Sequence, residues 1–280
     1  MKTALDTRIS RKFRALSEAG ELGLVAYVTA GDPTLDATEK IVLASAEAGA
    51  DVIELGVPFS DPVADGPTIQ RASERALASG TTLEGVLGLV KRIRAKSDVA
   101  IVLFSYFNPM LQMGLGKFAA AAAQAGADGV LATDLTPEEA GDYRAALNTN
   151  GLDAIFLVAP TTSDVRLGAV AEASSGFLYL ISRNGITGAQ DALPSDLPAL
   201  VRRVRKSTKL PVAVGFGISQ PTHVTVLGGL ADAAVVGSAL VAEIEMARSA
   251  DAAASAVAAK VASLKGAASK GVSRRSFDAP

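Results

Sequence analysis

The chain has 280 residues, a formal net charge of −2, 49% hydrophobic residues and 20% charged residues, which is typical of a globular protein with a large core and excludes a disordered chain. With no cysteine and a single histidine, His223, it is a poor candidate for a disulfide framework, a zinc enzyme, a cysteine nucleophile or a Ser–His–Asp hydrolase. Carboxylates, hydroxyls, lysines and backbone amides are left to carry any chemistry.

Eight short apolar runs, each followed by a segment with helical periodicity, organise the chain. We expect strands at 23–29, 52–56, 100–104, 129–132, 154–158, 176–181, 211–214 and 233–236. We expect helices at 35–48, 82–96, 115–125, 137–149, 163–175, 196–207, 220–229 and 239–264, with an extra helix at 7–19 before the first strand. Strands that are apolar on both faces indicate a parallel sheet covered by helices.

Eight strand–helix units in about 250 residues are the size of a (β/α)₈ barrel. The expected fold class is therefore α/β, a single TIM barrel with an extra N-terminal helix and long loops after strands 2 and 6. The alternative is an open doubly wound sheet, which usually carries GxGxxG after its first strand, where this chain has Thr-Ala-Gly-Asp-Pro at 29–33. We expect the barrel domain to span 1–265 and a flexible tail to span 266–280.

A helix-to-strand joint repeats along the chain. The segments 46–54, 123–131 and 148–156 each contain a glycine where a helix would end, then an aspartate, then an apolar run. A looser copy lies at 229–236. Glycine at this place supplies a left-handed helix cap, and the apolar run begins the next strand.

Glu54 interrupts an apolar strand. Alternation places Val52 and Glu54 on one face and Ile53 and Leu55 on the other. Because Leu55 needs the helix layer, Glu54 should point into the barrel near its mouth, where apolar neighbours would raise its pKa and suit it to proton transfer. The alternative is a glutamate that forms a salt bridge across the barrel floor.

Two long connections, 57–81 and 182–195, leave the strand ends where barrel active sites lie. The first contains Asp65, in a loop stiffened by prolines that could hold an acid over the mouth. Asp-Gly and Asp-Pro are also ordinary turn sequences. Local sequence leaves Asp65 open between catalysis and a turn, and favours a turn for Asp61.

Glycine-rich joints follow the last two strands and point to phosphate binding. Gly217 follows strand 7, and Gly237 precedes Ser238, which would cap the next helix. Loops after strands 7 and 8 are where barrels bind phosphate, and Gly188 could complete the cradle from loop 6. His223 is expected to be a surface or capping residue, and Tyr106 could line a substrate pocket.

The charge pattern favours a soluble, cytoplasmic protein that binds neither nucleic acid nor a membrane. The near-neutral charge gives no reason to expect nucleic acid, and the N-terminus lacks the apolar core of a signal peptide. The longest uncharged stretch, 99–116, contains Ser105, Asn108, Pro109 and Gln112, which would be costly in lipid.

The stretch 54–70, ELGVPFSDPVADGPTIQ, resembles the signature of the tryptophan synthase alpha subunit. The stretches 27–33, 179–188 and 215–218 support the resemblance, which extends over about 8–264. It implies cleavage of a phosphorylated indole, indole-3-glycerol phosphate, to indole and glyceraldehyde 3-phosphate, with no cofactor in this chain. It also implies a beta subunit that carries pyridoxal phosphate, takes up the indole through a tunnel and forms an alpha2beta2 heterotetramer.

The resemblance also implies roles for individual residues. Glu54 matches the acid/base and Asp65 the second carboxylate, while Pro58 and Asp134 lie near the beta-subunit contact. The implied substrate-binding residues are Tyr27, Tyr106, Tyr179, Thr187, Gly188, Phe216, Gly217, Gly237 and Ser238. Among these, Thr187 would close onto Asp65, and the glycines and Ser238 would hold the phosphate.

This sequence departs from the family at a few positions, and three other functions stay open. Tyr27 often has Phe as its counterpart, Thr136 often has Pro, and the tail beyond 264 is longer than usual. The alternatives are another phosphate-binding barrel enzyme such as a sugar-phosphate epimerase, a stand-alone indole-releasing lyase, and a non-catalytic regulatory subunit. Such epimerases rely on metal-binding histidines, and the presence of both Glu54 and Asp65 disfavours a regulatory subunit.

Overall fold

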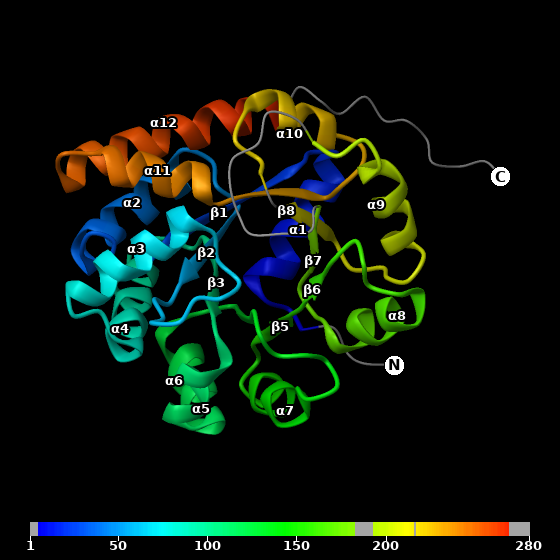
Figure 1. The fold of residues 1–280 in the computed structure, drawn as a ribbon, viewed down its shortest axis with the longest axis horizontal. Helices are drawn as coiled ribbons and strands as arrows, with labels where there is room; N and C mark the ends of the chain where they lie inside the picture. The colour runs from blue at the N-terminus through cyan, green and yellow to red at the C-terminus, as the bar shows by residue number, and fades with distance from the viewer. Residues whose placement is uncertain (1–4, 183–192, 216, 269–280) are drawn as a thin grey trace.

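The computed structural model describes residues 5–182, 193–215 and 217–268, which form a barrel of parallel strands surrounded by helices (Figure 1). The strands are β1 Gly23–Thr29, β2 Val52–Gly56, β3 Ala100–Ser105, β4 Gly129–Ala132, β5 Asp153–Ile155, β6 Leu157–Val158, β7 Leu178–Ile181, β8 Val212–Gly215 and β9 Ala233–Val236. The helices are α1 Arg8–Ala19, α2 Leu35–Glu47, α3 Pro67–Ala78, α4 Leu83–Arg94, α5 Phe107–Met113, α6 Leu115–Ala125, α7 Gly141–Thr149, α8 Asp164–Ala173, α9 Leu197–Arg205, α10 Pro221–Leu227, α11 Ser238–Met246 and α12 Ala250–Ala268.

The barrel closes through one short segment. The sheet order is β5-β4-β3-β2-β1-β9-β8-β7-β6, and every pairing is parallel. The two end strands, β5 and β6, are halves of the segment that we predicted as one strand, divided at Phe156. The first half pairs with β4 and the second with β7, so the predicted barrel is confirmed and the open sheet is wrong.

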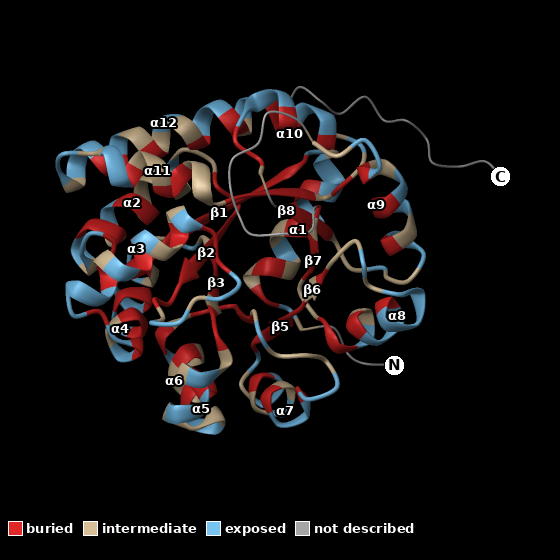
Figure 2. Ribbon diagram, viewed as in Figure 1, coloured by how far each residue is buried: buried red, intermediate tan, exposed pale blue. Residues whose placement is uncertain are grey.

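Each strand contributes to two separate cores, as alternation requires. Val25, Val52 and Val102 pack inside the barrel, whereas Ile53 and Leu55 pack outward against the helices. Figure 2 shows the strands buried along almost their whole length, while the helices are buried mainly on their inner sides. Continuous apolar strands are therefore needed here, because both faces of the sheet are covered.

The extra N-terminal helix is confirmed and closes the N-terminal end of the barrel. Ile9, Phe13 and Leu16 of α1 are buried in the inner core. The ring of Phe13 lies 5.5 Å from that of Phe177. Thr7, the N-cap of α1, donates a 2.6 Å hydrogen bond to Asp153 of β5. This end of the barrel is filled by side chains and cannot serve as the mouth.

In three of the four copies of the repeated helix-to-strand joint, the aspartate has a structural function. Asp51, Asp128 and Asp232 each accept a hydrogen bond, of 2.7 to 2.9 Å, from a backbone N–H near the start of the preceding strand. Each also pairs with a cation: Lys265 with Asp51, Arg94 with Asp128 and Arg205 with Asp232. Since these N–H groups belong to the first or second residues of β1, β3 and β8, the joints fasten neighbouring units at the N-terminal end.

Two helices were missed, and one predicted helix is divided. The connection predicted as a loop over 57–81 contains α3, since Gly66 and Pro67 form a helix start instead of part of a stiff loop. Helix α5 follows β3 directly and is only seven residues long, too short to leave a clear periodic signal. The helix predicted at 239–264 is α11 and α12, and α12 continues to Ala268, past the predicted boundary at 265.

Candidate active site

Glu54 lies inside the barrel on β2, as predicted. Its register neighbours are Tyr27 on β1 and Val102 on β3. The side chain is fully buried, and neither carboxylate oxygen has a hydrogen-bond partner among the residues described. Burial raises the pKa of Glu54 from 4.5 to about 8. The alternative of a salt bridge across the barrel floor is wrong, and the carboxyl is protonated at neutral pH.

Asp65 lies between β2 and α3, directly before Gly66, the N-cap of α3. Its side chain is buried, and Tyr106 donates a 3.1 Å hydrogen bond to Oδ2. Gln70 of α3 donates to the backbone carbonyl of Asp65 at 2.8 Å. Burial raises the pKa of Asp65 to about 6, against the opposing effect of the Tyr106 hydrogen bond. Asp65 is therefore ionised at neutral pH, where Glu54 is not.

Tyr106 holds the Asp65 loop in a way that the sequence analysis missed. Its hydroxyl accepts a 2.9 Å hydrogen bond from the N–H of Ala64 while donating to Asp65. Its ring stacks on Phe59 of the same loop, with 5.0 Å between centroids. A tyrosine placed directly after β3, next to β2 in the sheet, was the available signal. Asp61, by contrast, is an exposed loop residue, as predicted.

Two buried tyrosines lie over glycines at the ends of neighbouring strands. A Cβ on Gly56 of β2 would clash with the hydroxyl of Tyr27 on β1, and a Cβ on Gly215 of β8 would clash with that of Tyr179 on β7. Glycine is needed at both places to make room for the ring. Gly215, in the glycine-rich joint after β8, therefore has a steric function.

The carboxyls of Glu54 and Asp65 lie close enough to Tyr27 and Tyr179 to affect the pKa values of both tyrosines. Burial is the main reason that the pKa values of Tyr27 and Tyr179 lie above 10, and the charges of Asp65 and Glu54 raise both further. Tyr27 also contacts Phe104 edge-on, with 5.3 Å between centroids. Acids and aromatic rings therefore share the barrel mouth, which suits a flat apolar molecule that exchanges protons.

The structure describes three of the residues predicted to hold the phosphate, Gly217, Gly237 and Ser238. Gly217, in the turn after β8, has a φ of 82°, which disfavours side chains. Gly237 is the N-cap of α11 and lies against Tyr27. We expected Ser238 to cap this helix, and that is wrong, because Ser238 is its first residue. Helix geometry leaves the N–H groups of Ser238 and Ala239 without an intrahelical acceptor, so they suit an anion.

Several other predictions have plain outcomes. Thr187, Gly188 and Phe216 lie outside the described residues. His223 is buried rather than on the surface, and its Nδ1 accepts a 3.3 Å hydrogen bond from the N–H of Ser219, so it caps the turn after β8.

Within the described ranges, no three His, Cys, Asp or Glu side chains gather as a metal site would require. No helix in these ranges is long and apolar enough to span a bilayer.

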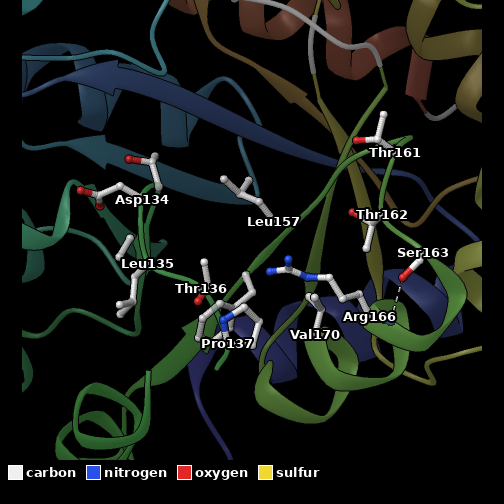
Figure 3. Close-up of a pocket in the computed structure, with 13 residues that line it drawn as sticks. Asp134, Leu135, Thr136, Pro137, Leu157, Thr161, Thr162, Ser163, Arg166 and Val170 are labelled. Atoms are coloured by element: carbon white, nitrogen blue, oxygen red, sulfur yellow. Dashed lines mark hydrogen bonds between the residues drawn. The ribbon is translucent and has the colours of Figure 1, made fainter. Parts of the chain in front are cut away.

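A separate hollow of about 510 Å³ lies between the loops after β4 and β6 (Figure 3). Leu135 and Thr136 line one side and Thr161 and Thr162 line the other. Arg166 of α8 extends between the two loops in Figure 3. Asp134, also in the lining, accepts a 2.7 Å hydrogen bond from the N–H of Phe107 at the start of α5. Neither Glu54 nor Asp65 lines this hollow.

Comparison with known proteins decides which family has this site. The family model described as tryptophan synthase alpha chain matches residues 13–269. The chain belongs to the tryptophan synthase alpha chain family. The activity of this family is the retro-aldol cleavage of indole-3-glycerol phosphate to indole and glyceraldehyde 3-phosphate, so the chain is a lyase.

Individual relatives agree with the family match. The tryptophan synthase alpha chain of Citrifermentans bemidjiense is 55% identical over 235 residues, covering 84% of this chain and 88% of the relative. That of Solibacter usitatus is 53% identical over 239 residues, covering 85% and 90%. A Mycobacterium tuberculosis tryptophan synthase structure has a TM-score of 0.87 at 35% identity, covering 95% of this chain and 99% of that chain. The subunit alpha from Legionella pneumophila has a TM-score of 0.87 at 37% identity, covering 94% and 99%.

Proposed function

We propose that this tryptophan synthase alpha chain cleaves its substrate with Glu54 as the acid/base and Asp65 as the second carboxylate. The observation that carries the proposal is the contrast between two buried carboxyls: Glu54 has no hydrogen-bond partner among the described residues, whereas Asp65 accepts a hydrogen bond from Tyr106. Burial raises the pKa of Glu54 to about 8 and that of Asp65 to about 6. Between these values one carboxyl is protonated and the other is charged. Two acids in different environments can then perform different steps of one reaction.

The protonated carboxyl would start the reaction. Glu54 transfers its proton to C3 of the indole ring, which converts an aromatic leaving group into an indolenine with an electrophilic C=N bond. The charged Asp65 stabilises the positive charge that develops at the ring N–H. The Glu54 carboxylate then takes the proton of the adjacent side-chain hydroxyl. As the aldehyde forms, the carbon–carbon bond breaks, and its electron pair restores the indole. Glu54 ends the cycle protonated.

The remaining mouth residues would position the substrate. The rings of Tyr27 and Tyr179 wall the indole, and Tyr106 keeps Asp65 directed at it. Gly217, Gly237 and Ser238 offer backbone N–H groups to the phosphate, and Thr187, Gly188 and Phe216 are proposed to complete the pocket. Binding of a phosphate away from the breaking bond provides energy for holding the substrate in the reactive geometry. The steps proposed require no metal or organic cofactor in this chain.

We further propose a beta subunit carrying pyridoxal phosphate as the partner, in a cytoplasmic alpha2beta2 complex that receives the indole. Pro58 and Asp134 lie on the same rim as Val63, whose side chain is 81% exposed. An exposed apolar residue at this end of the barrel suits a protein partner. The hollow containing Asp134 would be covered by that partner.

The test is an indole-release assay with and without purified beta subunit. We expect indole from the wild type and at least about 100-fold slower release from Glu54→Gln, because general acid catalysis is lost. Asp65→Asn should also be slow, whereas Asp61→Asn, an exposed neighbour in the same loop, should retain activity. Appreciable turnover by Glu54→Gln would contradict the acid/base assignment. A wild type that is unaffected by the beta subunit would favour the alternative of a stand-alone lyase.

A further inference from the structure

A cluster of four charged residues joins three parts of the barrel rim. We call Asp32, Arg71, Arg75 and Glu245 the rim ion cluster. Asp32 follows β1 and is 1% exposed, and Arg75 of α3 donates hydrogen bonds of 2.8 Å to both of its oxygens. A buried carboxylate with this two-pronged partner fixes the guanidinium in both position and orientation.

The same arginine reaches the other side of the cluster. Arg75 donates a 3.0 Å hydrogen bond to Glu245 of α11, and Arg71 donates two more, at 2.7 and 2.8 Å. The hydrogen bonds from Arg71 are the largest reason that the pKa of Glu245 lies near 2. Glu245 is therefore charged at every working pH. Three hydrogen bonds from this arginine pair tie α3 to α11, which lie side by side in Figure 1, and two more tie α3 to Asp32.

Both helices begin at the active site. Asp65 directly precedes the N-cap of α3, and Gly237 is the N-cap of α11. Between them, Ile69 and Ala72 of α3 pack against Val241 of α11 and the ring of Tyr27. The apolar contacts and the rim ion cluster thus hold the two helices together over successive turns.

We propose that Glu245 and Arg75 are positioning residues that couple the phosphate site at the start of α11 to the placement of Asp65 at the start of α3. The inference rests on the proposed function of Asp65 and of the phosphate cradle. An anion bound at the α11 N-terminus restrains that helix, and the rim ion cluster transmits the restraint to α3. Without Glu245, α3 stays fastened to Asp32 but loses its polar link to α11.

The experiment separates phosphate binding from its effect on the chemistry. The truncated substrate indole-3-glycerol is supplied to the full chain, and phosphite dianion serves as the probe of the phosphate site. In the wild type, phosphite should accelerate indole release. In Glu245→Ala, we expect the acceleration to be at least about tenfold smaller, because a small misplacement of a catalytic group has an effect of this size. The phosphite concentration that gives half of the full acceleration should stay nearly the same. With the phosphorylated substrate, kcat should fall and KM should hold.

A matched variant distinguishes coupling from loss of stability. Glu39 of α2 also accepts hydrogen bonds from two cations, Arg92 and Lys96, at 2.6 and 2.7 Å, and these partners lie on α4 and directly after it, not on α3 or α11. Glu39→Ala should lower the melting temperature yet keep the full phosphite acceleration. If Glu245→Ala does not fold, Arg71→Gln removes two of the three hydrogen bonds to Glu245 and should give a smaller loss of the same kind.

Each other outcome is decisive. Equal phosphite acceleration in the wild type and in Glu245→Ala would overturn the inference. So would a wild type that cleaves the phosphorylated substrate but is not accelerated by phosphite. A wild type that releases no indole from the phosphorylated substrate would instead refute the proposed function, and the inference with it.

Discussion

The two ends of the barrel use the same side chain for opposite purposes. At the N-terminal end, each of three aspartates accepts a hydrogen bond from a backbone N–H and pairs with a cation: Asp51, Asp128 and Asp232. At the mouth, Glu54 is buried among apolar groups and has no partner in the described ranges. A paired carboxylate stabilises the fold, whereas an unpaired one keeps its proton at neutral pH and costs stability. This difference separates the three structural aspartates from Glu54.

The largest expected effect is the pH dependence of stability that Glu54 imposes. Its folded pKa of about 8 lies above the unfolded value of 4.5, so the cost is absent below 4.5 and fully present above about 8. At about 1.36 kcal/mol for each pKa unit, ionisation of Glu54 should cost the wild type on the order of 5 kcal/mol of unfolding free energy across this range. Denaturant titrations at pH 4.5 and 9 should show a smaller loss in Glu54→Gln than in the wild type, where the remainder comes from other buried carboxyls such as Asp65. Parallel pH profiles would contradict the buried, unpaired state.

At the other end of the barrel, removing a paired acid should destabilise. Asp128 is buried and accepts hydrogen bonds from Arg94, Arg8 and the N–H of Ile101. Asp128→Ala should therefore lower the free energy of unfolding by about 3 kcal/mol. The folded variant should still release indole at low temperature. Asp98→Ala is the matched control, since Asp98 also pairs with Arg8 but is 93% exposed, and its unfolding midpoint should hardly change. A large loss of turnover in folded Asp128→Ala would blur the comparison.

The pH–rate profile should reflect the two mouth carboxyls. Activity requires ionised Asp65 and protonated Glu54, whose pKa values are about 6 and about 8. The plot of kcat/KM against pH should therefore be bell-shaped between these values and fall about tenfold for each pH unit outside them. Steady-state assays from pH 5 to 9 measure it. An alkaline side that stays flat to pH 9 would remove Glu54 as the acid.

The smallest effect concerns Tyr106. Its hydrogen bond lowers the pKa of Asp65 against the effect of burial, so Tyr106→Phe should raise that pKa. We expect the acidic limb of the profile to move up by about one pH unit, as the loss of a single hydrogen bond implies. Tyr143→Phe is the control, because Tyr143 donates to the backbone carbonyl of Val130 in the outer core. A shift of the same size in the control would argue against this contact.

Sequence patterns were sufficient for the inward direction of Glu54 and the repeated joints. In a sheet covered on both faces, the alternation of Val52, Ile53, Glu54 and Leu55 predicts that Ile53 and Leu55 face the helices and that Glu54 faces the inside of the barrel. The structure confirms this arrangement. Gly49, Gly126 and Gly151 have the positive φ predicted for helix caps. The repeated aspartates could be recognised in the sequence, but the hydrogen bonds that three of them accept could not. The backbone N–H that donates to each lies 20 or 27 residues earlier in the chain.

The sequence by itself determined the eight strand–helix units, the parallel sheet and the family signature, because short-range periodicity and local glycine chemistry encode them. Only the tertiary structure decided where the barrel closes, at Phe156, and that Tyr106 orders the Asp65 loop. It alone brought Asp32, Arg75 and Glu245 together. The raised pKa of Glu54 also belongs to the fold, since burial by residues from several strands removes water from the carboxyl. Such effects sum over contacts distant in the chain, which no local pattern records.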